Sequence, residues 1–297
     1  MEPEEIVRKA LLGRKYEEVR IFSNGWNSLA AVIDSSDVIK IAREPQYSEK
    51  VDREFSILRE LSTILSFGIP SPVEKGSVCG RTYVIYHMIK GSILCPDPLF
   101  NGTNECVLST LSTGTRRRVD NQLSRITSEL HSIDTSILSS DILPGLGGAS
   151  VIASGFLSRF RSLGKKYLGL KEQENLNERL AILNHTYFRN ENQVTLIHGD
   201  FGTWNMLYSD GQITGIIDWG EAGIGDPAID VMEIIYSMGE QSARRIFSWC
   251  RSSDKVFFRA LTYLSFSGFF DIEYGERLGD RRLIERGLVS LREKLCL

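Results

Sequence analysis

The sequence lacks several features that mark specialised classes of protein. Its 297 residues include only five cysteines, an odd number without a C-x-x-C pair. That usage argues against a disulfide framework or a zinc ribbon, and it fits a reducing, cytoplasmic location. A formal net charge of -3 provides no broad basic field, so we expect neither nucleic acid nor a membrane as partner. No apolar run reaches the ~20 residues of a membrane helix, and the acidic, amphipathic start does not resemble a signal peptide.

What is present is ordinary globular composition whose periodicity changes along the chain. With 42% hydrophobic residues, the chain can form one large domain or two lobes. Strand-like, β-branched runs surround one helical pattern from Gln46 to Phe67. These runs cover residues 19–25, 27–34, 38–43, 73–78 and 81–88.

After an irregular segment at 92–115, apolar residues recur mainly at helical spacing. The expected helices cover 116–133, 150–168, 171–188, 227–238, 242–251, 255–270 and 281–295. A strand-rich island, Thr195–Asp218, interrupts them. The predicted fold is therefore α+β and bilobal, with a β-rich lobe at 1–90 (five strands and one long helix) and a mainly helical lobe at 91–297. Ligands bind preferentially between such lobes.

The island carries the polar residues with the most chemical content. These polar residues lie within "LIHGDFGTWNMLYSDGQITGIIDWGEAGIGDPAID", which runs from Leu196 to Asp230. Gly211 supplies a turn, so the flanking runs can pair as a hairpin that brings Asn205 beside Asp218, about 5 Å apart between backbones. Two hard oxygen ligands at one place favour Mg²⁺, with substrate phosphates completing its shell. Asp200, in the loop that enters the hairpin, can face an incoming hydroxyl.

These motifs resemble the catalytic core of protein-kinase-like enzymes, through H-x-D-x-x-x-x-N and a following D-x-G. The H-G-D variant, with "DWGEA" and "GDPAID", is similar to the aminoglycoside phosphotransferase family, and most like the hygromycin B phosphotransferases. The resemblance implies a protein-kinase-like fold whose first lobe binds nucleotide and whose second holds the catalytic loop and acceptor site. It implies Asp200 as catalytic base, Asn205 and Asp218 as Mg²⁺ ligands, and His198 and Asp230 as supports of the loop.

The N-terminal lobe offers the cationic partner that such enzymes use. The resemblance implies that Lys40, in the strand "VIKIAR", holds the α- and β-phosphates of the nucleotide. Glu54 falls on the apolar face of the helix at 46–67, and an inward carboxylate needs a partner. Glu49 and Glu60 fit that face less well and remain alternatives.

Two further segments match nucleotide contacts by the same resemblance. "FSNGWNS" lies where a phosphate-covering loop is expected, although it lacks G-x-G-x-x-G and has one glycine. "YVIYHMIKG" corresponds to the hinge between the lobes, with ATP expected and GTP not excluded. The expected nucleotide contacts are Ser23, Gly25, Asn27 and Ser28 in the loop and the backbones of His87 and Ile89 in the hinge.

A second absence in the sequence bears on the nature of the acceptor. No long activation segment ending in A-P-E follows Asp218, which favours a small-molecule hydroxyl over a protein as acceptor. A polycationic aminoglycoside would need acidic groups in the cleft. The candidates are Glu221, Glu233, Asp271 and Glu273. A metabolite kinase of the choline, homoserine or thiosugar type and a non-catalytic nucleotide-binding module remain alternatives, and the sequence leaves the oligomeric state open.

Overall fold

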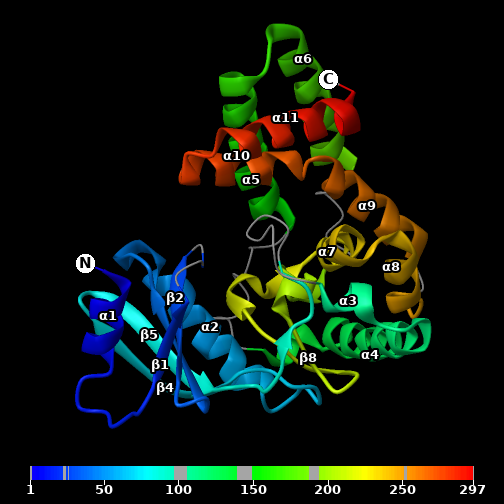
Figure 1. Cartoon of the computed structure of the whole chain (residues 1–297). Coiled ribbons are helices and arrows are strands. Elements are labelled where there is room, and N and C mark those ends of the chain that lie inside the picture. Colours follow the sequence, from blue (N-terminus) through cyan, green and yellow to red (C-terminus); the bar gives the residue numbers. More distant parts are fainter. Residues whose placement is uncertain are drawn as a thin grey trace.

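A five-stranded antiparallel sheet forms the core of the N-terminal lobe (Figure 1). The computed structural model describes residues 2–22, 25, 27–96, 106–138, 149–186, 194–250 and 253–296. The strands, in the order β1-β2-β3-β5-β4, are β1 Val19–Phe22, β2 Ser28–Ile33, β3 Asp37–Ala42, β4 Ser71–Val78 and β5 Arg81–His87. Helix α1, Pro3–Ala10, packs on the face that carries Ile39 and Ile41. Strand alternation therefore turns Lys40 toward the opposite face.

Helix α2, Ser48–Leu61, covers that opposite face and is shorter than predicted. The sequence pattern extended it from Gln46 to Phe67, but Pro45–Tyr47 forms a 3₁₀ turn, η1, instead. At the other end the Ser62 and Thr63 hydroxyls donate to the carbonyls three residues earlier, at 3.0 and 2.8 Å. Such local bonds compete with helix propagation, which explains the early end.

The remaining chain is mainly helical, which confirms the predicted bilobal α+β fold. Its short strands are β6 Ser92–Ile93, β7 Thr195–Ile197, β8 Met206–Ser209, β9 Gln212–Ile216 and β10 Gly223–Gly225. They pair as β6-β8-β9 and β7-β10. The α-helices are α3 Val107–Thr110, α4 Thr113–His131, α5 Ala149–Tyr167, α6 Leu170–Thr186, α7 Ala228–Met238, α8 Glu240–Ile246, α9 Ser253–Ser265, α10 Gly268–Leu278 and α11 Arg281–Leu295. The 3₁₀ turns are η2 Thr135–Ile137, η4 Thr203–Asn205 and η5 Trp219–Glu221. Within the described ranges, every helix falls short of the length and hydrophobicity needed to cross a bilayer.

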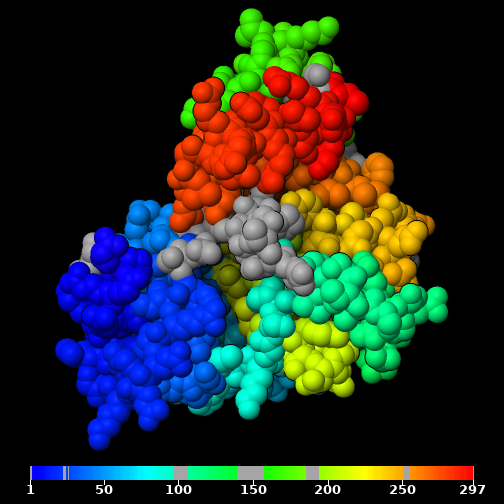
Figure 2. All heavy atoms as spheres, viewed as in Figure 1, coloured from blue at the N-terminus to red at the C-terminus, as the bar shows by residue number. Residues whose placement is uncertain are grey.

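Two hydrophobic clusters hold the second lobe together. One lies beneath the β8–β9 hairpin and contains Phe201 and Trp219, and the other joins α5, α6, α10 and α11. Figure 2 shows the orange and red C-terminal helices projecting above the blue N-terminal mass. This layout places α10 near the N-terminal lobe, where Glu273 of α10 and Tyr47 line one cavity of about 430 Å³.

The helix predicted at 255–270 is two helices in the structure, α9 and α10. The chain turns between Ser265 and Gly268, and α10 then packs against α11. A Cβ on Gly268 would lie 2.4 Å from the carbonyl oxygen of Gly287, so both positions need glycine for this close crossing. A tertiary contact of this kind leaves no trace in the helical periodicity.

One disulfide, Cys95–Cys106, joins the segment after β6 to the start of α3 in the described part of the chain. The cysteine usage, from which no disulfide framework was expected, did not predict this bond. A disulfide requires the two cysteines to lie side by side. The neighbouring segments are held together by the Val107 amide, which donates to the Leu94 carbonyl oxygen at 3.0 Å. The bond spans part of the segment at 92–115, of which residues 97–105 lie outside the described ranges.

A buried ion pair ties α7 to α9. The carboxylate of Asp226 accepts two bonds from the Arg259 guanidinium at 2.7 and 2.8 Å and one from the Tyr263 hydroxyl at 2.7 Å. It also accepts the Ala228 amide at 2.9 Å, at the start of α7. Asp226 belongs to the "GDPAID" motif, so this part of the motif has a structural function.

Asp226→Ala is expected to lower the free energy of unfolding by about 3–5 kcal/mol, because it strands a buried guanidinium. The measurement is a urea unfolding curve, with the midpoint falling at an unchanged slope. Asp254→Ala, on the same α9 helix with a 97% exposed side chain, is the control and should change stability by less than about 0.5 kcal/mol. Equal losses in the two variants would contradict this role for Asp226.

Candidate active site

Three charged side chains from separate elements meet between the lobes. Lys40 Nζ, on β3, donates to Glu54 Oε2 of α2 at 2.5 Å and to Asp218 Oδ1 at 2.8 Å. Lys40 and Glu54 are buried, whereas the Asp218 side chain is 51% exposed toward the space between the lobes. Burial alone would lower the pKa of Lys40, but the charges of Asp218 and Glu54 raise it well above its usual value. The cluster therefore presents a permanent ammonium group beside an accessible carboxylate.

The backbone at Asp218 is held in an unusual conformation. Its φ of 63° and ψ of 65° place it in the left-handed region, which is uncommon for residues other than glycine and frequent at functional sites. Helix α2 fixes the next residues: Glu54 Oε1 accepts the Trp219 amide at 3.2 Å, and Arg53 donates to Gly220 O at 2.6 Å. Lys50 of the same helix pairs with Glu221. The position of Asp218 thus depends directly on α2.

Asp200 lies at the mouth of the β8–β9 hairpin with both carboxylate oxygens engaged. The Trp204 indole N–H donates to Oδ1 at 3.0 Å, and the Asn205 amide donates to Oδ2 at 2.8 Å. Burial and the neighbouring charge of Asp218 raise the pKa of Asp200 to about 7, although these two bonds favour the ionised form. A carboxylate with a pKa near neutrality is suited to accept a proton from a hydroxyl.

The side-chain amide of Asn205 is held by Asp200. Its amide nitrogen is committed to Asp200, which leaves the amide oxygen directed elsewhere. The Ile217 backbone amide donates to the backbone carbonyl oxygen of Asn205 at 2.9 Å. The chain just before Asp218 therefore runs beside Asn205 at the open end of the hairpin. No group of three or more His, Cys, Asp or Glu side chains that could hold a metal occurs within the described ranges. One carboxylate and one amide oxygen fit a hard cation that takes its other ligands from phosphates.

Buried groups hold the loop at 198–205, which carries Asp200 and Asn205. Asp230, on α7, accepts the amides of His198 and Gly199 at 3.1 and 2.9 Å and the His131 ring nitrogen at 2.8 Å. Burial lowers the pKa of His198, whose ring bonds Ile217 O at 3.1 Å. A neutral, buried imidazole bound in this way supports the loop and is not placed to act as a base. Gly199 has a φ of 79°, and a Cβ there would lie 2.6 Å from the Glu221 carbonyl oxygen.

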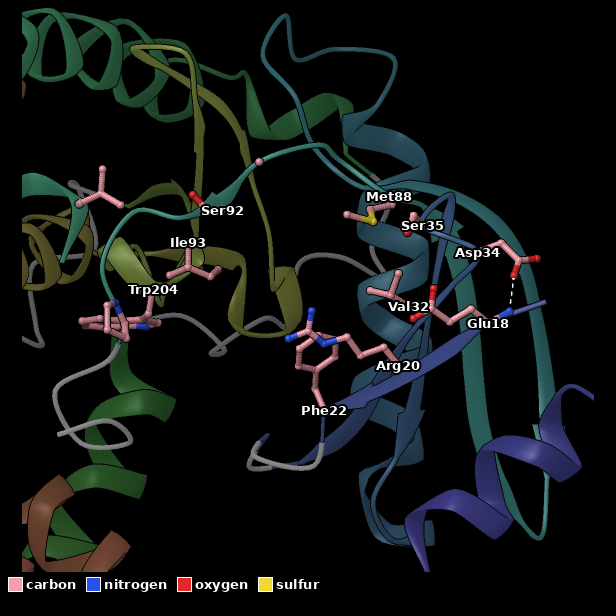
Figure 3. Close-up of a pocket in the computed structure, with 13 residues that line it drawn as sticks. Glu18, Arg20, Phe22, Val32, Asp34, Ser35, Met88, Ser92, Ile93 and Trp204 are labelled. Carbon is pink, nitrogen blue, oxygen red and sulfur yellow. Dashed lines mark hydrogen bonds between the residues drawn. The ribbon is translucent and has the colours of Figure 1, made fainter. Parts of the chain in front are cut away.

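A cavity of about 800 Å³ separates the sheet from the second lobe. In Figure 3, Arg20, Phe22 and Val32 line one side, and Ile93 and Trp204 line the other. Apolar side chains lie on both sides of this cavity, and Glu18, Arg20 and Asp34 add charged groups to its lining. A mixed lining of this kind can hold a planar base.

The hinge contributes to this cavity through Met88 and Gly91. The Met88 amide is engaged with Ser36 O at 2.8 Å. The exposed His87 ring is directed to Asp37, at 2.8 Å, and the Ile89 side chain faces Gly215. A purine contact by His87 or Ile89 would therefore use their backbone groups.

The residues of the phosphate-covering loop are placed only in part. Gly25 is exposed, and its carbonyl accepts the Arg43 guanidinium at 2.9 Å. Asn27 lines the cavity of about 430 Å³, and Ser28 begins β2 opposite Ala42. Ser23 lies outside the described residues.

The four acidic acceptor candidates do not gather at one place. Glu221 is next to the catalytic loop, and its charge contributes to the raised pKa of Asp200. Asp271 and Glu273 lie on α10, where they pair with Arg286 and Arg159 at 2.9 and 2.7 Å. Glu233 lies on α7, half-buried. Glu221, Asp271 and Glu273 are thus each paired with a basic side chain.

Sequence reasoning missed Trp204, Lys50 and Arg53. Trp204 stood inside the H-x-D-x-x-x-x-N motif, directly before Asn205, and that position was the available signal. Lys50 and Arg53 lie one helical turn and one residue before Glu54. Their contacts with η5 span more than 160 residues of chain, so no local pattern indicates them.

Comparison with known proteins agrees with this geometry. Residues 18–246 match the phosphotransferase enzyme family, so the chain belongs to that family, and the resemblance seen in the sequence is confirmed. It is 33% identical over 104 residues to viomycin phosphotransferase of Streptomyces vinaceus, covering 33% of this chain and 36% of that protein. It is 46% identical over 41 residues to hygromycin-B 4-O-kinase of Escherichia coli, covering 14% of this chain and 12% of that protein.

Likeness of fold extends over nearly the whole chain. The GDP complex of wild-type aminoglycoside 2'-phosphotransferase-IIIa superposes with a TM-score of 0.78 at 20% identity, covering 99% of this chain and 97% of that one. By sequence, the chain spans only about a third of the length of the viomycin enzyme. The solved structure shows the fold of the chain and does not identify its acceptor.

Proposed function

We propose that the chain is an ATP-dependent phosphotransferase that moves the γ-phosphate to a hydroxyl of a small molecule, with a hygromycin-like aminoglycoside as the first acceptor to test. The observation that carries this proposal is the meeting of Lys40, Glu54 and Asp218 opposite Asp200 and Asn205. Family membership and the match to hygromycin-B 4-O-kinase support it. GTP is the second donor to test, because the aminoglycoside 2'-phosphotransferase-IIIa structure holds GDP.

In this proposal each residue has one task. Lys40, held by Glu54, binds the α- and β-phosphates, and the hinge backbones of His87 and Ile89 bind the base. Asn205 and Asp218 would hold Mg²⁺, which when bound neutralises phosphate charge. Asp200 orients the acceptor hydroxyl and takes its proton as the oxygen attacks the γ-phosphorus and the bond to the β-phosphate oxygen breaks. Phosphoryl transfer of this kind depends on positioning and electrostatics.

One observation favours a second class of acceptor. Lys50, Arg159 and Arg286 neutralise Glu221, Glu273 and Asp271, which lowers the attraction of the described cleft for a polycation. Acceptors with few amino groups, including metabolites of the choline, homoserine or thiosugar type, therefore belong in the same test.

The deciding experiment is a coupled assay of ADP release over a panel of aminoglycosides, other antibiotics and small alcohols. Release that depends on an aminoglycoside, with the phosphate found on that acceptor, supports the proposal. Release with a metabolite alone supports the second class. Nucleotide binding without release on any acceptor would replace both with a non-catalytic binding module.

A further inference from the structure

Trp204 is the described residue that links the catalytic carboxylate to the large cavity. Its indole N–H donates to Asp200 Oδ1 at 3.0 Å, while its ring forms part of the wall of the 800 Å³ cavity. Figure 3 shows the Trp204 ring beside Ile93, across the cavity from Arg20 and Phe22. No other described residue both bonds Asp200 and lines that cavity.

The surrounding chain is built to hold this ring in place. A Cβ at Gly202 would lie 2.1 Å from the Trp204 ring, so the ring lies directly over a glycine and could not do so over any larger residue. The Trp204 ring also meets the Tyr236 ring of α7, at an angle of 76° and with centroids 6.1 Å apart. The glycine and the tyrosine together hold the indole beside Asp200.

We propose that Trp204 is a positioning residue for Asp200, which it holds through its indole N–H. The inference rests on the proposed function, in which Asp200 takes the proton of the acceptor hydroxyl. With the indole at Oδ1 and the Asn205 amide at Oδ2, the carboxylate is held from both sides, so loss of the indole N–H would leave it free to turn away from the hydroxyl.

Trp204→Phe tests this role, because it keeps an aromatic ring in the same place but removes the N–H. We expect kcat to fall by about 10-fold, as for the loss of one hydrogen bond to a charged group, with acceptor KM within about twofold. A merely structural role would lower activity without this split between kcat and KM.

Trp249→Phe is the matched control, because its indole N–H also makes one bond, to the Thr127 hydroxyl at 3.1 Å, away from the cavity. This variant should keep both kinetic constants. Loss of kcat in Trp249→Phe equal to that in Trp204→Phe, or an unchanged kcat in Trp204→Phe, would overturn the positioning role.

A spectrum of the chain labelled with ¹⁵N-tryptophan tests the contact without any turnover. The indole resonance that disappears in Trp204→Phe belongs to Trp204, and it should shift in Asp200→Asn while that of Trp249 stays. A Trp204 resonance that does not move contradicts the hydrogen bond. A shifted resonance in a protein that phosphorylates no acceptor would overturn the proposed function and not the contact.

Discussion

Asp200→Asn is expected to lower turnover by about 10²–10⁴-fold, the usual contribution of a positioned general base. The change keeps the size of the side chain but removes the group that takes the acceptor's proton. It also disturbs the loop, because the carboxylate accepts the Trp204 indole at one oxygen and the Asn205 amide at the other. An amide has only one oxygen, so one of these two donors loses its acceptor.

Nucleotide affinity should stay within about twofold in this variant, because the Lys40 cluster is untouched. Equal affinity in the variant and in the unsubstituted chain would show that the loss is confined to the reaction step. Turnover is measured by coupled ADP release at saturating acceptor, and nucleotide binding by calorimetry. Asp210→Asn, at the exposed turn of the same hairpin, is the control and should retain full turnover. Turnover near that of the unsubstituted chain in Asp200→Asn would remove Asp200 from the mechanism.

The parts of the site that the sequence predicted are those fixed by local geometry. A hairpin through Gly211 necessarily brings its two open ends together, and the pairing of Met206 with Ile216 does so for Asn205 and Asp218. Alternation along a strand turned Lys40 away from Ile39 and Ile41, and helical phase turned Glu54 inward. In each case a single period, two or 3.6 residues, determines where the side chain points.

The parts that could not be predicted depend on contacts between distant segments. The acidic acceptor candidates were chosen by charge, but their partners Lys50, Arg159 and Arg286 come from other helices. The break between α9 and α10 depends on a glycine of α11, and the Cys95–Cys106 bond depends on the chain returning beside β6. Residues such as these carry no periodic signal of their partners, so the surroundings of the acidic acceptor candidates were less predictable than the Lys40–Glu54 pair.

Asp218→Asn should show the opposite pattern from Asp200→Asn. Loss of the carboxylate removes both a proposed metal ligand and one partner of Lys40, so the Mg²⁺ concentration that supports half-maximal turnover should rise at least ~10–100-fold. Asparagine is chosen because it tolerates the left-handed backbone at this position, where φ is 63°. Lys40 keeps its bond to Glu54, which should preserve the folded N-terminal lobe.

Asp200→Asn and Asp218→Asn are expected to differ in nucleotide and Mg²⁺ binding. Asp200→Asn should bind Mg²⁺-nucleotide normally and turn over slowly, whereas Asp218→Asn should bind nucleotide without metal normally and lose the gain in affinity that Mg²⁺ provides. Calorimetric titration of nucleotide with and without Mg²⁺ separates these cases. A Mg²⁺ dependence in Asp218→Asn equal to that of the unsubstituted chain would place the metal elsewhere, and the carboxylate beside Lys40 would then serve only to hold the lysine. The left-handed backbone at Asp218 argues against that outcome, because a carboxylate needed only for an ion pair would not require so uncommon a conformation.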